Sequence, residues 1–114
     1  MLVVDDDPAV LRAFVRLTRE LPLDLVTALS AEQGLLVLDK QRVDVVVSDY
    51  QMLGMDGVTF LRLVGERYPG VRRVLHTGTT ATPSLGSGIE ALPKPCEPAE
   101  LARLLGVGAT SSGR

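Results

Sequence analysis

Residues 44–49 of the chain, DVVVSD, decide its fold. Three consecutive valines and a serine precede Asp49, and such a run without polar alternation is typical of a strand that is buried on both faces. The stretch that follows, YQMLGMDG at 50–57, contains two glycines that give its backbone freedom to turn. The lone carboxylate of Asp49 at the end of this strand is therefore either a local cap or part of a chemical site.

Length and composition indicate one soluble domain. The chain has 114 residues, of which 46% are hydrophobic and 4% aromatic, so its core is expected to consist of Leu, Val and Ala. A net charge of −2 gives no reason to expect direct binding to nucleic acid. The single cysteine, Cys96, cannot form an internal disulfide, and the sequence shows neither a signal peptide nor an apolar run that could cross a bilayer. These features predict a cytoplasmic protein without a membrane partner.

Strand-like and helix-like segments alternate along the chain. Short apolar runs predict strands at 1–5, 24–29, 44–49, 71–78 and 90–94. Helical periodicity predicts helices at 7–21, 31–42, 56–68 and 98–106. Asp7 with Pro8 marks the start of the first helix and Pro22 its end, while Ser30 with Gln33 forms a capping box before the second. Such alternation predicts an α/β protein with a doubly wound parallel sheet between two layers of helices.

Polar side chains follow four of the five predicted strands. In a parallel sheet with right-handed crossovers, the carboxyl ends of the strands meet at one rim, where ligands bind. We therefore expect a group of polar side chains to converge at that rim, namely those of Asp5, Asp6, Asp49, Thr77 and Lys94.

The residue types in this group point to metal and phosphate chemistry. Three carboxylates brought together repel one another, and a hard divalent cation such as Mg²⁺ would neutralise them. The ammonium of Lys94 and the hydroxyl of Thr77 are suited to hold a phosphoryl group. An aspartate such as Asp49 can itself act as the nucleophile that accepts phosphate.

Four motifs, in order, resemble a known family. LVVDDDP at 2–8, SDYQM and GMDG around Leu53, LHTG at 75–78 and LPKP at 92–95 are similar to motifs in the receiver domain of two-component response regulators. The resemblance covers residues 2–106, so we assign 1–106 to a receiver domain and 107–114 to a polar tail. It implies a flavodoxin-like five-stranded sheet in the order 2-1-3-4-5.

The resemblance also implies a role for each matching residue. Asp49 corresponds to the phosphoacceptor, Thr77 to the switch hydroxyl and Lys94 to the lysine of the site. The bond between Lys94 and Pro95 is expected to be cis. The ligands of Mg²⁺ would be the carboxylates of Asp5, Asp6 and Asp49 and the backbone carbonyl of Gln51.

Several other residues have simpler explanations. We expect Asp7 and Asp56 to cap helices rather than bind metal. His76 is expected to be packed or surface-exposed rather than catalytic, Ser48 is interpreted as a packing residue, and Cys96 as a small residue at a helix entry rather than a redox centre. We assign three leucines of the second helix to the core: Leu35, Leu36 and Leu38.

The sequence departs from the family pattern in the loops and at the output face. Leu53 stands where the family usually has proline, and Ala91 stands where it commonly has an aromatic residue that moves with the switch hydroxyl. The connection from Thr77 to Lys94 is shorter than in most members, and residues 78–90 are rich in Gly, Ser and Thr. We therefore expect a shortened or irregular fourth helix there, with at most two turns.

Three functions remain open from the sequence. The leading hypothesis is a receiver, not an enzyme with a separate substrate, that accepts a phosphoryl group on Asp49 from a sensor histidine kinase or a phosphotransfer protein. It would then signal to an unknown downstream protein through altered contacts. The alternatives are a degenerate receiver that acts without phosphorylation, and a phosphatase with an aspartate nucleophile. Gln51 weakens the phosphatase hypothesis because it stands where such enzymes carry an acid.

Overall fold

A computed structural model describes residues 1–78 and 88–106 of the chain. Within these residues it contains five strands and four helices. The strands are β1 (Leu2–Val4), β2 (Val26–Ala28), β3 (Val45–Asp49), β4 (Arg72–Thr77) and β5 (Ile89–Pro93). The helices are α1 (Pro8–Thr18), α2 (Ala31–Lys40), α3 (Gly57–Arg67) and α4 (Pro98–Leu105).

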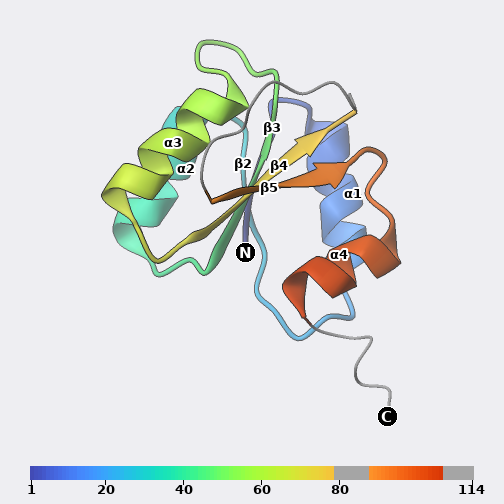
Figure 1. Cartoon of the computed structure of the whole chain (residues 1–114). Helices are drawn as coiled ribbons and strands as arrows, with labels where there is room; N and C mark the ends of the chain where they lie inside the picture. Colours follow the sequence, from blue (N-terminus) through green and yellow to red (C-terminus); the bar gives the residue numbers. More distant parts are fainter. Residues whose placement is uncertain (79–87, 107–114) are drawn as a thin grey trace.

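The five strands form one parallel sheet in the order β2-β1-β3-β4-β5. Helices α2 and α3 cover one face of the sheet, and α1 and α4 cover the other (Figure 1). The predicted doubly wound three-layer fold and its strand order are therefore confirmed. In the register between β3 and β4, Asp49 lies opposite His76, so the polar ends of both strands reach the same rim.

Two apolar clusters hold the helices on the sheet. Alternate residues of the central strand serve opposite faces: Val46 packs under α2 and α3, whereas Val47 packs under α1 and α4. Phe60 of α3 and Phe14 of α1 are the largest buried side chains of the two clusters. Because the middle of β3 is buried on both sides, the sheet gives Asp49 a fixed position at its edge.

Side chains cap the first three helices as the sequence predicted. The carboxylate of Asp7 accepts from the amide of Ala9, and Pro8 occupies the first turn of α1. The hydroxyl of Ser30 accepts from the amide of Gln33 at the start of α2. Asp56 caps α3 by accepting from the amide of Thr59. Each cap satisfies a backbone donor that the first turn of a helix leaves unpaired.

Two local predictions are wrong. Helix α1 ends at Thr18, not at residue 21. The Thr18 hydroxyl donates to the carbonyl of Phe14 and so competes with backbone amides for this helical acceptor. Leu36 is exposed rather than part of the core. The buried face of α2 is set by Ala31, Gly34 and Leu38, and Leu36 lies between them on the outer side of the helix.

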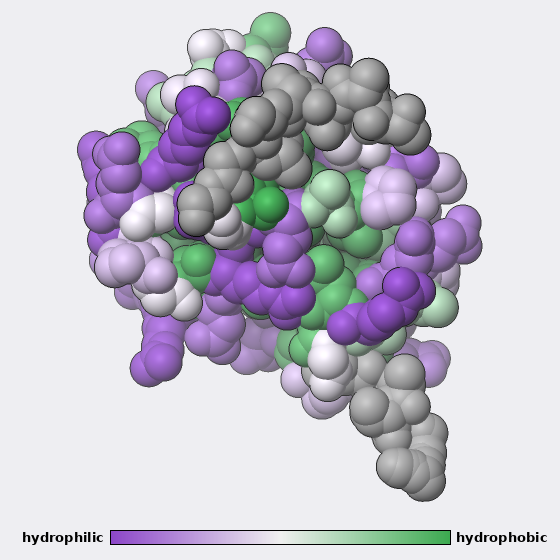
Figure 2. All heavy atoms as spheres, in the orientation of Figure 1, coloured by the Kyte–Doolittle hydropathy of each residue, from purple (hydrophilic) through white to green (hydrophobic). Residues whose placement is uncertain are grey.

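The predicted irregular connection and the polar tail fall mainly outside the described residues. Residues 79–87 and 107–114 are not described, so the prediction of a shortened fourth helix is not tested. On the face that Figure 2 shows, the visible hydrophobic residues form several small areas separated by hydrophilic residues. Across residues 1–78 and 88–106, we find no helix with the length and apolar character needed to span a membrane.

Candidate functional site

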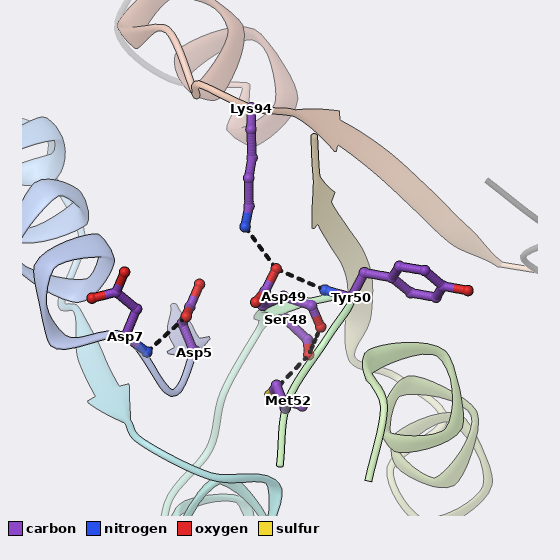
Figure 3. A network of polar contacts seen from close by, with 7 residues as sticks. All are labelled: Asp5, Asp7, Ser48, Asp49, Tyr50, Met52 and Lys94. Atoms are coloured by element: carbon purple, nitrogen blue, oxygen red, sulfur yellow. Dashed lines mark hydrogen bonds and ion pairs between the residues drawn. The ribbon is translucent and has the colours of Figure 1, made fainter. Parts of the chain in front are cut away.

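Asp49 is held in a defined orientation at the end of β3. Its carboxylate oxygen Oδ1 accepts a hydrogen bond from the amide of Tyr50 at 2.9 Å and one from Nζ of Lys94 at 2.7 Å (Figure 3). Only 12% of the Asp49 side chain is exposed. The carboxylate is therefore paired with a positive charge and held in one orientation. A residue that only caps the end of a strand needs neither feature.

Two further carboxylates follow β1 and face different surroundings. Asp5 is 2% exposed, and its Oδ1 accepts from the amide of Asp7 at 2.9 Å. Its Oδ2 is buried and has no hydrogen-bond partner among residues 1–78 and 88–106, and burial raises the pKa of this carboxyl. Asp6 is exposed, and its Oδ2 accepts from the amide of Leu53 at 3.2 Å.

Asp5, Asp6 and Asp49 form one cluster, with an oxygen from each lying within 4.8 Å of the others. An all-oxygen set of this size suits Mg²⁺, which binds through carboxylates, carbonyls and water. The unpartnered buried oxygen of Asp5 supports this fit, because a cation would offset the cost of burying it. Asp7 instead caps α1, as the sequence predicted.

Lys94 reaches the cluster from the loop after β5. Its backbone amide donates to the carbonyl of Thr77 at 3.0 Å, which fixes this loop beside the end of β4. The bond between Lys94 and Pro95 is cis, as predicted. Thr77 is buried at the end of β4. The fold therefore brings both residues to the same rim as the three carboxylates.

Gln51 lies in the loop between β3 and α3 with an exposed side chain. The role of its carbonyl as a metal ligand stays a prediction. Leu53, which replaces the usual proline, is 86% exposed, yet its amide ties the loop to Asp6. The backbone of this loop thus takes part in the site even where its side chains point to solvent.

Gly57 has a structural role that sequence reasoning did not identify. A Cβ atom built on Gly57 would lie 1.9 Å from the carbonyl oxygen of Asp49, a distance that no side chain can tolerate. The amide of Gly57 also donates to the carbonyl of Tyr50 at 2.7 Å. The start of α3 therefore packs directly on the backbone that carries the acceptor residue, and only glycine permits this approach. The sequence feature that could have indicated this close contact is the glycine that directly follows the capping residue Asp56.

Ser48 is a packing residue, as predicted, and His76 is packed rather than surface-exposed. Ser48 is fully buried and its hydroxyl donates to the carbonyl of Asp49 at 2.9 Å. His76 is buried with its ring edge-on to Phe14, at 5.1 Å between centroids, and burial lowers the pKa of His76 to about 4. Cys96 is partly buried, and burial raises the pKa of its thiol to about 11, which makes it a poor redox centre.

Comparison with known proteins decides the family. Residues 1–105 match the family model described as the response regulator receiver domain. The chain belongs to this family. The resemblance drawn from the four sequence motifs is thereby confirmed, and the site described above occupies the positions that those motifs mark.

Relatives of this receiver domain include longer regulators. The transcriptional regulatory protein GlrR of Escherichia coli (strain K12) is 38% identical over 84 residues, which are 73% of this chain and 19% of that protein. The heme response regulator HssR of Staphylococcus aureus (strain JH9) is 46% identical over 56 residues, which are 49% of this chain and 25% of that protein. The chain thus spans a quarter or less of the length of these relatives.

A solved receiver domain shares the same fold. The signal receiver domain of an HD domain-containing protein from Pseudomonas fluorescens Pf-5 superposes with a TM-score of 0.84. It is 33% identical in sequence, and the match covers 91% of this chain and 88% of that one. The response regulator receiver domain (CheY-like) of Methanospirillum hungatei JF-1, at 24% identity and a TM-score of 0.83, supports the fold alone.

Proposed function

We propose that this receiver domain accepts a phosphoryl group on Asp49 from the phosphohistidine of a sensor histidine kinase or a phosphotransfer protein. The observation that carries the proposal is the 2.7 Å contact between Lys94 Nζ and Asp49 Oδ1 beside the carboxylates of Asp5 and Asp6. An aspartate that could act as the nucleophile, a cation and two further carboxylates that could bind a metal therefore lie together at one rim. This combination matches what phosphoryl transfer requires: positioning together with neutralisation of charge.

Each residue has a separate task in the transfer. A carboxylate oxygen of Asp49 forms the new bond to phosphorus while the bond from phosphorus to the donor nitrogen breaks. Lys94 offers its ammonium to the negative oxygens of the transferred group. Asp5 and Asp6, with Asp49 and the Gln51 carbonyl, would hold Mg²⁺, which supplies positive charge against the incoming phosphoryl oxygens. The backbone amide of Tyr50 keeps the Asp49 carboxylate oriented.

The modified domain would signal by contact rather than by turnover of a metabolite. A phosphoryl group on Asp49 gives Lys94 and Thr77 a new set of acceptor oxygens, and a change in their positions alters the surface around them. The proposed output is therefore a protein partner that reads this surface in the cytoplasm, without direct contact of the domain with nucleic acid. Turnover of a separate substrate is not part of the proposal.

Beryllofluoride, a mimic of the phosphoryl group, provides the test. The full chain is titrated with beryllofluoride in the presence of Mg²⁺, and amide NMR signals of residues near Asp49, Thr77 and Lys94 are followed. We expect saturable shifts that require Mg²⁺ and are absent in Asp49→Asn. If wild type and Asp49→Asn respond alike, the domain is a degenerate receiver. Steady release of product from a phosphoester substrate would instead indicate a phosphatase.

A further inference from the structure

Ser48 is the polar residue of β3 that directly precedes the acceptor Asp49. Its side chain is fully buried, and its partners on the neighbouring strands are Val4 of β1 and Leu75 of β4, both apolar and fully buried. An alanine or a valine at this place would be buried without the cost of removing a hydroxyl group from water. Burial alone therefore does not explain a serine at position 48.

The Ser48 hydroxyl binds one end of the peptide group that joins Asp49 to Tyr50. It donates to the carbonyl oxygen of Asp49 at 2.9 Å, and the amide at the other end of the same peptide group donates to Asp49 Oδ1, also at 2.9 Å (Figure 3). The hydroxyl also lies 3.9 Å from Met52 Sδ, which is a weaker acceptor. Because a peptide group is planar, its carbonyl and its amide rotate together. The hydroxyl that holds the carbonyl thus also holds the amide toward the carboxylate.

Gly57 of α3 packs against the same peptide group. A Cβ atom built on Gly57 would lie 1.9 Å from the carbonyl oxygen of Asp49 and 2.9 Å from its carbonyl carbon. The amide of Gly57 fixes the next peptide group, because it donates to the carbonyl of Tyr50 at 2.7 Å. Packing limits the space that the peptide group can occupy, whereas a hydrogen bond also sets its direction. Ser48 therefore adds a directional contact to a peptide group that α3 already confines.

We propose that Ser48 is a positioning residue for phosphoryl transfer. Its hydroxyl orients the peptide group between Asp49 and Tyr50, and the Tyr50 amide then holds the Asp49 carboxylate in the orientation that attacks phosphorus. A carboxylate held less firmly attacks less often, because the attacking oxygen must lie in line with the leaving group. The inference rests on the proposed function and deepens it, but the orientation itself can be measured in the chain without metal or phosphate.

Hydrogen exchange of the Tyr50 amide tests the orientation without Mg²⁺ or a phosphodonor. Ser48→Ala removes the hydroxyl and adds no atoms. We expect the Tyr50 amide to exchange about three- to tenfold faster in Ser48→Ala than in wild type, beyond any change shared by the amides of Val46 and Val47, because one hydrogen bond is lost. Unchanged exchange of the Tyr50 amide relative to these two core amides would overturn the proposal.

The rate of phosphorylation by acetyl phosphate tests the consequence for transfer. In this reaction the bond from phosphorus to the acetate oxygen breaks as a bond from an Asp49 oxygen to phosphorus forms, and acetate leaves. At saturating Mg²⁺, the rate followed by intact mass should fall about three- to tenfold in Ser48→Ala. Equal rates in wild type and Ser48→Ala would overturn the positioning role. A wild-type chain that gains no phosphoryl group would instead overturn the proposed function, even where the exchange of the Tyr50 amide responds as expected.

Thr18→Val is the matched control for loss of a buried hydroxyl. Thr18 is buried at the carboxyl end of α1, whereas the acceptor rim lies at the start of this helix, and its hydroxyl donates to the carbonyl of Phe14 at 2.9 Å. Thr18→Val should lower stability about as much as Ser48→Ala does, without a change in the transfer rate or in the relative exchange of the Tyr50 amide.

Ser48→Thr tests rescue, because it keeps a hydroxyl at the same position. It should retain the exchange of the Tyr50 amide and most of the wild-type transfer rate. Slowing of transfer in Ser48→Thr or in Thr18→Val equal to that in Ser48→Ala would show that packing or stability, not the Ser48 hydroxyl, is the cause, and would overturn the proposal.

Discussion

Nζ of Lys94 lies 2.7 Å from Oδ1 of Asp49, although 45 positions of sequence separate the two residues. The contact joins the end of β3 to the start of the loop after β5, at the residue that precedes the cis bond to Pro95. The ammonium is 33% exposed and the carboxylate 12% exposed, so water screens the pair only in part. Lys94 therefore offsets part of the negative charge of the cluster that Asp49 shares with Asp5 and Asp6.

Replacement of Lys94 should have opposite effects on the two ligands of the site. Lys94→Met removes a positive charge next to three carboxylates, so Mg²⁺ should bind about three- to tenfold more tightly. The same variant should bind beryllofluoride more weakly, because the Lys94 ammonium that would pair with this negatively charged mimic is missing. Both affinities can be measured by calorimetry or NMR titration. Lys40→Met, at the exposed end of α2, is the control. Weaker Mg²⁺ binding in Lys94→Met would contradict this electrostatic role.

Gly57→Ala should damage the site through the backbone. The new Cβ would lie 1.9 Å from the carbonyl oxygen of Asp49, so α3 and the strand end must move apart. We expect a loss of roughly 2–3 kcal/mol in the free energy of unfolding, measured with urea, together with weaker Mg²⁺ binding. Gly70→Ala is the matched control, because its Cβ would meet nothing within 4 Å, and it should change stability by less than about 1 kcal/mol. Equal effects of the two substitutions would refute the close-contact explanation.

Asp6 and Asp7 are neighbours with separate roles. Asp7→Ala removes the cap of α1 and should cost about 1 kcal/mol of stability, while Mg²⁺ affinity falls little. Asp6→Ala removes a member of the carboxylate cluster and should weaken Mg²⁺ binding at least tenfold. Urea unfolding and a Mg²⁺ titration of both variants test this assignment. It fails if Asp7→Ala weakens Mg²⁺ binding as much as Asp6→Ala does.

His76 should make the fold sensitive to acid. The pKa of His76 is about 4 in the folded protein and near 6.5 when unfolded, so the unfolded chain binds a proton first as pH falls. Stability from this group is fully present above pH 6.5 and is lost between pH 6.5 and 4, by about 2–3 kcal/mol. Urea unfolding of wild type and His76→Phe at pH 7 and 4.5 isolates this contribution. An identical loss in both proteins would show that His76 is not the cause.

The order and type of most elements could be predicted from the sequence, because buried parallel strands appear as short, continuous apolar runs. The continuous apolar run before Asp49 predicted a strand buried on both sides, and β3 has that position. Since parallel strands end at one rim, the sequence also predicted that Asp5, Asp6 and Asp49 would meet, and their oxygens lie within 4.8 Å. Lys94 was assigned to the same rim for the same reason, and it contacts Asp49 directly.

Details that depend on distances between elements could not be predicted in this way. The approach of Gly57 to the Asp49 carbonyl arises from how α3 packs on β3, and no spacing in the sequence encodes it. Leu36 and the end of α1 at Thr18 were misassigned because helix faces and ends are set by tertiary contacts as well as by periodicity. The burial of His76 edge-on to Phe14, with Nε2 unpartnered among the described residues, likewise depends on how α1 packs on β4.

The central claim is that Asp49 accepts a phosphoryl group with the help of Mg²⁺. The most direct test is incubation of the full chain with acetyl phosphate, followed by intact-mass measurement with Mg²⁺ or with EDTA. Wild type with Mg²⁺ should gain the mass of one phosphoryl group, and neither the EDTA sample nor Asp49→Asn should gain it. A wild-type chain that stays unmodified with Mg²⁺, or an Asp49→Asn variant that gains the same mass, would contradict the claim.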